Sequence, residues 1–213
     1  MEHYLRKYWR SRFQFNWKLG VFLILLFGIP RFIIVLQSYV DRSYGIVMFV
    51  FLSMWIVPFI LLTKDGRRNI GIRRPSHWWR IVLSFIAGGL ICYIIFSIFS
   101  VLFQTSVENA FVYIGGNNPS SDIAGPNRSI YFWIAVIPSM IFSPIGEEFL
   151  YRGIIHGSFV PKFGEAKASI FDSLAFALTH IAHFGIIYMS GVWHFLPGPT
   201  ALWVLSMFIT SQV

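Results

Sequence analysis

The sequence predicts an all-α membrane protein, a polytopic bundle of about six transmembrane helices in which the last span is incomplete. Composition is the first observation behind this prediction: of 213 residues, 56% are hydrophobic and 12% are charged. A soluble domain has about 25% charged residues. The second observation is a series of apolar runs, several of which approach the roughly 20 residues that a helix needs to cross a bilayer. These features exclude an ordinary soluble domain and a disordered chain.

The net charge of +8 has two interpretations. It indicates either a surface that binds nucleic acid or the excess of basic residues that membrane proteins carry on the cytoplasmic side. In so apolar a chain we favour the second. We therefore expect the lipid bilayer as a partner and no nucleic acid. The single cysteine, Cys92, rules out an intramolecular disulfide and a cysteine-rich zinc site.

Three spans are expected in the N-terminal part of the chain, over residues 17–40, 44–63 and 79–103. The first is too long for the apolar core of a signal peptide. Pro30 and Arg31 interrupt it. We therefore expect this helix to be kinked there, or Arg31 to face protein or to reach toward the membrane surface.

The loops predict the orientation of the chain. Basic residues are concentrated in the first 18 positions and in the 64–80 loop, whereas the 104–127 loop contains Glu108 and Asp122 and no lysine or arginine. By the positive-inside rule, the N-terminus and the 64–80 loop face the cytoplasm, and the 104–127 loop is external and irregular. The small size favours a bacterial cytoplasmic membrane.

Three further apolar segments follow. A fourth helical region is expected over residues 130–160, bent near Pro144 and followed by a turn at 161–167. A fifth span is expected over 168–184. The last apolar stretch, 199–213, has about 15 residues, fewer than a span requires.

Charged residues inside the fourth region are the clearest functional signal. Glu147, Glu148 and Arg152 lie in an apolar helix, where each charge costs about 2.5–3.5 kcal/mol to insert. Such a group must pair within the protein. Glu148 precedes Arg152 by four residues, the favoured orientation for a helical ion pair. Glu147 is then left in a poorly hydrated position beside a like charge, which suits a general base near neutral pH.

The fifth span contributes Asp172, His180 and His183. Glu147 and His180 are separated from the 161–167 turn by nearly equal lengths of helix, roughly 20 Å at 1.5 Å per residue. An antiparallel helical hairpin therefore brings them to the same depth. A carboxylate and an imidazole at one depth can hold a water molecule and remove its proton. His156, near a helix end, is explained by the helix dipole alone.

These residues resemble the CPBP family of intramembrane proteases, the CAAX prenyl protease 2 and bacteriocin-processing (Abi) group. The family motifs E-E-x-x-x-R and F-x-x-x-H appear as Glu147-Glu148-x-x-x-Arg152 and Phe176-x-x-x-His180. The resemblance implies a peptidase that cleaves a membrane-associated peptide or protein, CAAX-like or bacteriocin-related. It also implies that Glu147 and His180 activate water, that Glu148 and Arg152 support them, and that no metal is required.

The resemblance covers residues 129–213, which we take as a protease core. Residues 1–128 form an N-terminal basic segment with spans one to three. The family has a third motif, H-x-x-x-N or H-x-x-x-D, on a later helix, where it stabilises the oxyanion. No such motif follows His180. We therefore expect a chain that is truncated at its C-terminus and lacks that half of the site.

Three alternatives stay open from the sequence. The first is a zinc site, for which the candidate ligands are Glu147, Glu148, His180 and His183, since carboxylate and imidazole both bind zinc. The second is a non-catalytic membrane protein, such as a bacteriocin self-immunity or protein-binding factor with the same fold. The third is a proton-coupled transporter, which the absence of a visible internal repeat disfavours.

Overall fold

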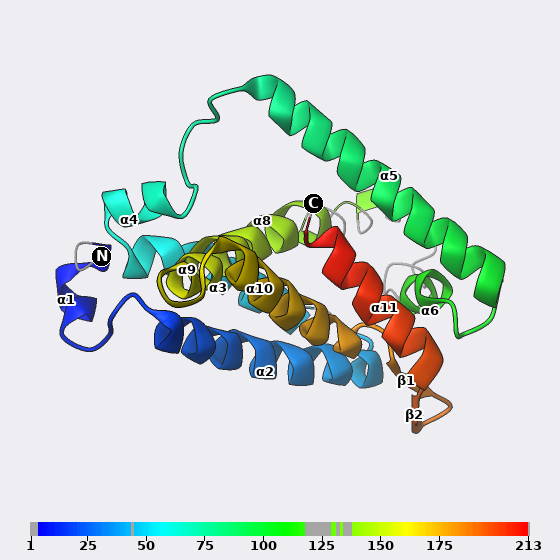
Figure 1. Cartoon of the computed structure of the whole chain (residues 1–213). Helices are drawn as coiled ribbons and strands as arrows, with labels where there is room; N and C mark the ends of the chain where they lie inside the picture. Colours follow the sequence, from blue (N-terminus) through cyan, green and yellow to red (C-terminus); the bar gives the residue numbers. More distant parts are fainter. Residues whose placement is uncertain (1–3, 44, 118–128, 131–132, 134–137, 213) are drawn as a thin grey trace.

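The computed structural model describes residues 4–43, 45–117, 129–130, 133 and 138–212, and the chain over these residues is mostly helical (Figure 1). Two helices of the described part are long and apolar enough to cross a membrane: α2 (Trp17–Asp41) and α5 (Trp78–Phe103). A third apolar helix, α3 (Gly45–Leu61), is shorter. The predicted class, a helical membrane protein, is thus supported, and the full number of six spans remains a prediction.

The N-terminal segment lies against the end of α3. It contains the short helix α1 (Lys7–Arg10), and α4 (Lys64–Asn69) follows α3. The backbone N–H of Thr63 donates to the carbonyl of Tyr4 at 2.8 Å, and the Thr63 hydroxyl caps α4 by accepting from the N–H of Gly66 at 3.1 Å. The N-terminus and the start of the 64–80 loop therefore share one end of the molecule, as the predicted orientation requires.

Helix α2 begins at the Asn16 cap, whose side chain accepts from the N–H of Lys18. It continues through Pro30 and ends at Arg42, which has a φ of 49°. Arg31, in the middle of this helix, is 1% exposed. Of the outcomes expected for this arginine, the structure therefore selects burial against protein.

Helix α5 is the most exposed long element, with 6% of its apolar window buried. Figure 1 shows α5 at one edge of the molecule and α2 at the opposite edge. The buried Phe99 of α5 packs edge-on against Phe184 and Trp203. The 104–127 loop is less irregular than expected, because Asn109 caps a short helix, α6 (Ala110–Gly116). Residues 118–127 of that loop lie outside the described residues.

The fourth predicted region is helical from 138 to 163, although residues 131–132 and 134–137 lie outside the described part. Four segments follow one another: η2 (Pro138–Phe142), α8 (Ser143–Glu147), η3 (Glu148–Ile155) and α9 (His156–Phe163). The η2 and η3 segments are π-helical, and such segments occur frequently at functional sites. The hydrogen bonding changes from π- to α-helical between Phe142 and Ser143, and the bend near Pro144 stays a prediction.

The fifth predicted span begins three residues earlier than expected and ends two residues earlier. It comprises α10 (Glu165–Thr179) and the 3₁₀ turn η4 (His180–Ala182). Gly164, with a φ of 77°, joins α9 to α10, and the two helices form the predicted antiparallel hairpin (Figure 1).

A β-hairpin that the all-α prediction missed follows this span. Its strands are β1 (Ile186–Met189) and β2 (Val192–Phe195). Ser190 and Gly191 both have positive φ, 51° and 83°, which is the geometry of a two-residue hairpin turn. Helix α11 (Pro197–Thr210) comes last and packs on α10 and α5.

Two glycines allow the helices around the site to approach closely, as small residues do in membrane bundles. A Cβ on Gly20 of α2 would meet the side chains of Ser158 and Phe159 on α9. A Cβ on Gly146 of α8 would lie 2.8 Å from the carbonyl oxygen of Phe51 on α3. These contacts hold α2 and α3 against the helix that carries Glu147.

Candidate active site

Four charged or imidazole side chains meet at one atom in the interior. Nη2 of Arg31 lies 2.5 Å from Oε1 of Glu147. The same nitrogen lies 3.4 Å from Nε2 of His180 and 3.3 Å from Nε2 of His183. The structure therefore brings Glu147 and His180 to the same depth, as the equal helix lengths predicted. It also adds His183, and it adds Arg31 from α2.

The orientation of His180 follows from its hydrogen bonds. Its Nδ1 lies 2.8 Å from the carbonyl oxygen of Phe176, and a carbonyl only accepts, so Nδ1 carries the hydrogen. Nε2 then presents a lone pair toward Arg31 and Glu147. The Phe176 ring packs on the imidazole at 4.3 Å between centroids, and Trp203 donates to the His180 carbonyl at 3.0 Å. The imidazole is therefore fixed with its accepting nitrogen in the site.

The group is enclosed mainly by aromatic side chains. The guanidinium of Arg31 lies 5.2 Å from the centroid of the Phe51 ring. Tyr151 is 1% exposed and interacts electrostatically with Arg31 and Glu147. Glu147 itself is 8% exposed. A charge pair so poorly hydrated interacts far more strongly than one at a surface.

Arg152 belongs to a second cluster, between η3, α9 and α10. Its Nη1 pairs with Oδ1 of Asp172 and donates to the hydroxyl of Ser173 at 2.9 Å. Oδ2 of Asp172 lies 2.6 Å from Nδ1 of His156. On the other side of that ring, Nε2 lies 2.9 Å from Oε2 of Glu165. His156 therefore bridges two carboxylates, and the helix dipole was an insufficient explanation for it.

Glu148 and Arg152 interact electrostatically, as predicted, but the direct ion pair of Arg152 is with Asp172. Within the described residues, Arg152 is paired with Asp172, and Glu148 is exposed. The physical reason is local: residues 148–155 are π-helical, so positions four apart no longer stack as they do in an α-helix. In addition, Asp172 is fully buried and offers Arg152 a less hydrated partner.

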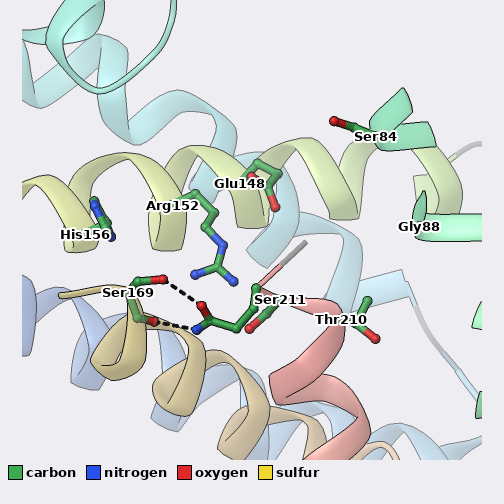
Figure 2. A pocket seen from close by; sticks show the side chains of 9 residues that line it. Ser84, Gly88, Glu148, Arg152, His156, Ser169, Thr210 and Ser211 are labelled. Carbon is green, nitrogen blue, oxygen red and sulfur yellow. Dashed lines mark hydrogen bonds between the residues drawn. The ribbon is translucent and has the colours of Figure 1, made fainter. Parts of the chain in front are cut away.

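A polar pocket of about 520 Å³ opens beside this second cluster (Figure 2). Figure 2 shows Glu148, Arg152 and His156 on one wall and Ser169 on the facing helix. The Gln212 amide closes one side by donating to the carbonyl of Ser169 at 3.0 Å. The complete lining is Ser84, Gly88, Glu148, Arg152, His156, Ser169, Thr210, Ser211 and Gln212. The four predicted site residues are thus divided, with Glu147 and His180 at Arg31, and Glu148 and Arg152 at this pocket.

The residues proposed as zinc ligands do not fit a metal ion in this arrangement. No group of three or more His, Cys, Asp or Glu side chains is spaced to hold one in the part of the chain that the structure describes. Glu147, His180 and His183 converge on the guanidinium of Arg31, which already supplies a positive charge there. Glu148 lines the polar pocket instead.

The fold and site define a class: a helical membrane protein in which a carboxylate and two imidazoles meet one buried arginine. Residues 129–211 match the family model described as Type II CAAX prenyl endopeptidase Rce1-like. The chain therefore carries an Rce1-like segment, and the family resemblance predicted from the two motifs is confirmed. No curated protein and no solved structure matches the chain.

Sequence reasoning missed Arg31 as a site residue. It lies in the first span, outside the 129–211 segment that matches the family model. Its signal was an arginine in the middle of an apolar run, which is itself a marker of function in a membrane helix. The sequence did not show which charged group it meets, because its partners lie more than 100 residues away along the chain.

Proposed function

We propose that the protein is an intramembrane endopeptidase in which Glu147 is the general base and His180 holds the attacking water. One observation carries the proposal: Glu147 and His180 both lie within 3.4 Å of one nitrogen of Arg31, inside an Rce1-like segment. The substrate class that the family description favours is a prenylated peptide or protein tail with a CAAX-type end.

The chemistry follows from the two accepting groups. For catalysis a water molecule takes the place of Arg31 Nη2 at His180, while Arg31 stays beside Glu147. This water donates one hydrogen bond to Glu147 and the other to Nε2 of His180, which is unprotonated because Nδ1 carries the hydrogen. The water oxygen attacks the scissile carbonyl carbon as its proton moves to Glu147. Glu147 then gives that proton to the leaving nitrogen when the C–N bond breaks.

Glu148 and Arg152 serve this chemistry from outside the reacting centre. The Arg152–Asp172 pair joins η3, which follows Glu147 directly, to α10, which leads to His180. This link supports the alignment of the two motif helices and hence the spacing of base and imidazole. Arg152 is in this view a positioning residue, and Glu148 contributes polarity to the adjoining pocket.

The test is cleavage of a fluorogenic farnesylated peptide ending in C-a-a-X by the purified full chain in liposomes. We expect Glu147→Gln to lower the rate by at least 10²-fold, the contribution typical of a general base. Glu108→Gln is the matched control, because Glu108 is exposed in the 104–127 loop, and it should retain the wild-type rate.

Two outcomes would contradict the proposal. In one, Glu147→Gln cleaves the peptide as fast as the wild type does. In the other, the wild type leaves the peptide intact while Glu147→Gln still protects cells against a bacteriocin, which would favour a non-catalytic immunity factor.

A further inference from the structure

The guanidinium of Arg31 is buried with most of its donors unused. Within the residues that the structure describes, Nη2 alone contacts acidic or imidazole groups, namely Glu147, His180 and His183. By distance and angle, Nε and Nη1 have no hydrogen-bond partner among the described residues, although both atoms are shielded from solvent and the buried Tyr151 hydroxyl interacts with Arg31. A buried donor without a partner costs about 1–3 kcal/mol, and more when it is charged. These two nitrogens therefore need an explanation.

A purely structural ion pair explains them poorly. Arginine–carboxylate pairs that serve stability are frequently bidentate, with two parallel N–H···O bonds. Arg31 instead reaches Glu147 through one nitrogen. One face of its guanidinium lies over the Phe51 ring. A buried pair with so few partners contributes little to stability, because desolvation offsets the attraction between the charges.

Building on the proposed function, we propose that Arg31 is a third catalytic residue, which stabilises the negative charge of the tetrahedral intermediate. Its position fits this role because it lies at the point where the base and the water-holding imidazole meet. Arginine also stays protonated in proteins, so its charge is constant through the reaction.

The charges balance at each step. Before attack, the negative charge is on Glu147, opposite Arg31. The water oxygen forms a bond to the carbonyl carbon, the water proton moves to Glu147, and the carbonyl π electrons move onto the carbonyl oxygen. The negative charge has then passed from Glu147 to the oxyanion. Arg31 loses its anionic partner in the same step in which a new anion forms, and its unused N–H groups are available to that anion.

The collapse of the intermediate reverses this exchange. The electron pair on the oxygen re-forms the carbonyl as the C–N bond breaks, and the proton on Glu147 moves to the leaving nitrogen. Glu147 is again an anion beside Arg31. The net charge of the site is the same throughout, and no charge is left unpaired in a water-poor interior, where donors aimed at a developing charge are most effective.

The first test compares Arg31→Gln and Arg31→Lys with the wild type on the farnesylated C-a-a-X peptide. We expect Arg31→Gln to lower kcat by about 10²–10³-fold, the effect of losing one oxyanion donor. Its KM should stay within about threefold of the wild-type value, because both proteins bind the unreacted peptide equally well. Arg31→Lys keeps the positive charge but loses the planar set of donors. Its kcat should therefore lie between those of the wild type and Arg31→Gln. Arg68→Gln, at an exposed position of α4, is the matched control.

A second test stays valid if Arg31→Gln fails to fold. The double variant Arg31→Gln/Glu147→Gln removes both charges and leaves a neutral pair of similar shape. Its affinity is measured for the same peptide with a phosphinate in place of the scissile amide, an anionic tetrahedral analogue of the intermediate. We expect it to bind this analogue at least 10²-fold more weakly than Glu147→Gln alone. Affinity for the unmodified peptide should be similar in the two variants.

The outcomes separate the two proposals. If the wild type cleaves the peptide but Arg31→Gln keeps kcat within about threefold, the role of Arg31 is overturned and the protease stands. Equal phosphinate affinity of the double variant and Glu147→Gln overturns it as well. If the wild type cleaves nothing and binds the phosphinate no better than the amide, both proposals fail.

Discussion

Two arginine–carboxylate pairs connect the helices of this protein, and they differ in burial and in how many of their polar atoms have a partner. The Arg152 side chain is 23% exposed and that of Arg31 is 1% exposed. Asp172 accepts from Arg152 and from His156, Arg152 also donates to Ser173, and one guanidinium nitrogen of Arg152, Nη2, has no partner in the described structure. The Arg31–Glu147 pair meets two imidazole nitrogens and leaves two guanidinium nitrogens without a partner in the described structure.

With the proposed function, the comparison separates a network that aligns helices from one that acts on a substrate. A network whose members share many hydrogen bonds rigidifies the helices that it joins. A charged group with unused donors costs stability, and it is retained where those donors act on something else. We therefore assign the Arg152 cluster to alignment and the Arg31 cluster to chemistry.

The largest expected effect separates the two histidines that face Arg31. His180→Ala should lower kcat by about 10²–10⁴-fold, because the residue that holds the water is lost. His183→Ala should cost much less, since the same nitrogen of Arg31 keeps Glu147 and His180 as partners. The measurement is kcat on the farnesylated peptide, and equal losses for the two variants would contradict the role given to His180.

The next prediction concerns stability. Asp172→Leu removes the direct partner of the partly buried Arg152, and it should destabilise the protein by less than the roughly 3–5 kcal/mol typical of breaking a fully buried pair. The double variant Arg152→Met/Asp172→Leu should recover much of that loss. The free energy of unfolding in mixed micelles is the measurement. An unfolding free energy of the double variant as low as that of the single variant would show that the pair is more than a link between helices.

A third prediction concerns a substitution that displaces the Arg31 cluster and leaves the Arg152 cluster in place. Gly20→Val places a side chain against Ser158 and Phe159 and should push α2 from α9, at a cost of about 1–3 kcal/mol. Arg31 then moves from Glu147, while the α9–α10 cluster keeps its partners. In Gly20→Val, the cleavage rate should fall by a larger factor than the fraction of folded protein does. Gly89→Ala is the control, because a Cβ at Gly89 meets nothing within 4 Å.

The smallest expected effect is that of a metal chelator. Because Arg31 lies where the zinc ligands would have to converge, we expect 1,10-phenanthroline to change the cleavage rate by less than about twofold, compared with the 10²–10³-fold expected for loss of an oxyanion donor. The control is 1,7-phenanthroline, which has the same shape and does not chelate. Loss of cleavage with the chelator alone, restored by added zinc, would contradict the metal-free prediction.

The parts of the site that follow from helix periodicity were predictable from the sequence. The depth match of Glu147 and His180 depends on rise per residue and on one turn, and both are local properties. The direct partner of Arg152 is Asp172 and not Glu148, because a π-helical segment changes which side chains stack, and no residue in 148–155 signals that change. Arg31 was conspicuous in the sequence, but its partners are set by the packing of α2, which local spacing does not encode.

The fold was predictable to the same extent. The first three apolar helices begin and end within a few residues of their expected positions, because their length and composition determine them. The β-hairpin at 186–195 was missed, since its strands are four residues each and its only strong signal is Ser190-Gly191. Helix α6 was missed in the same way, as a short helix inside a polar loop.

The position of Arg31 has a consequence for how the protein is made. Helix α2 is synthesised long before its partners, and His180 follows Arg31 by 149 residues. The first span therefore enters the bilayer with an arginine that has no counter-charge, at a cost of about 2.5–3.5 kcal/mol at the membrane centre. That cost is relieved when α8 brings Glu147 to Arg31.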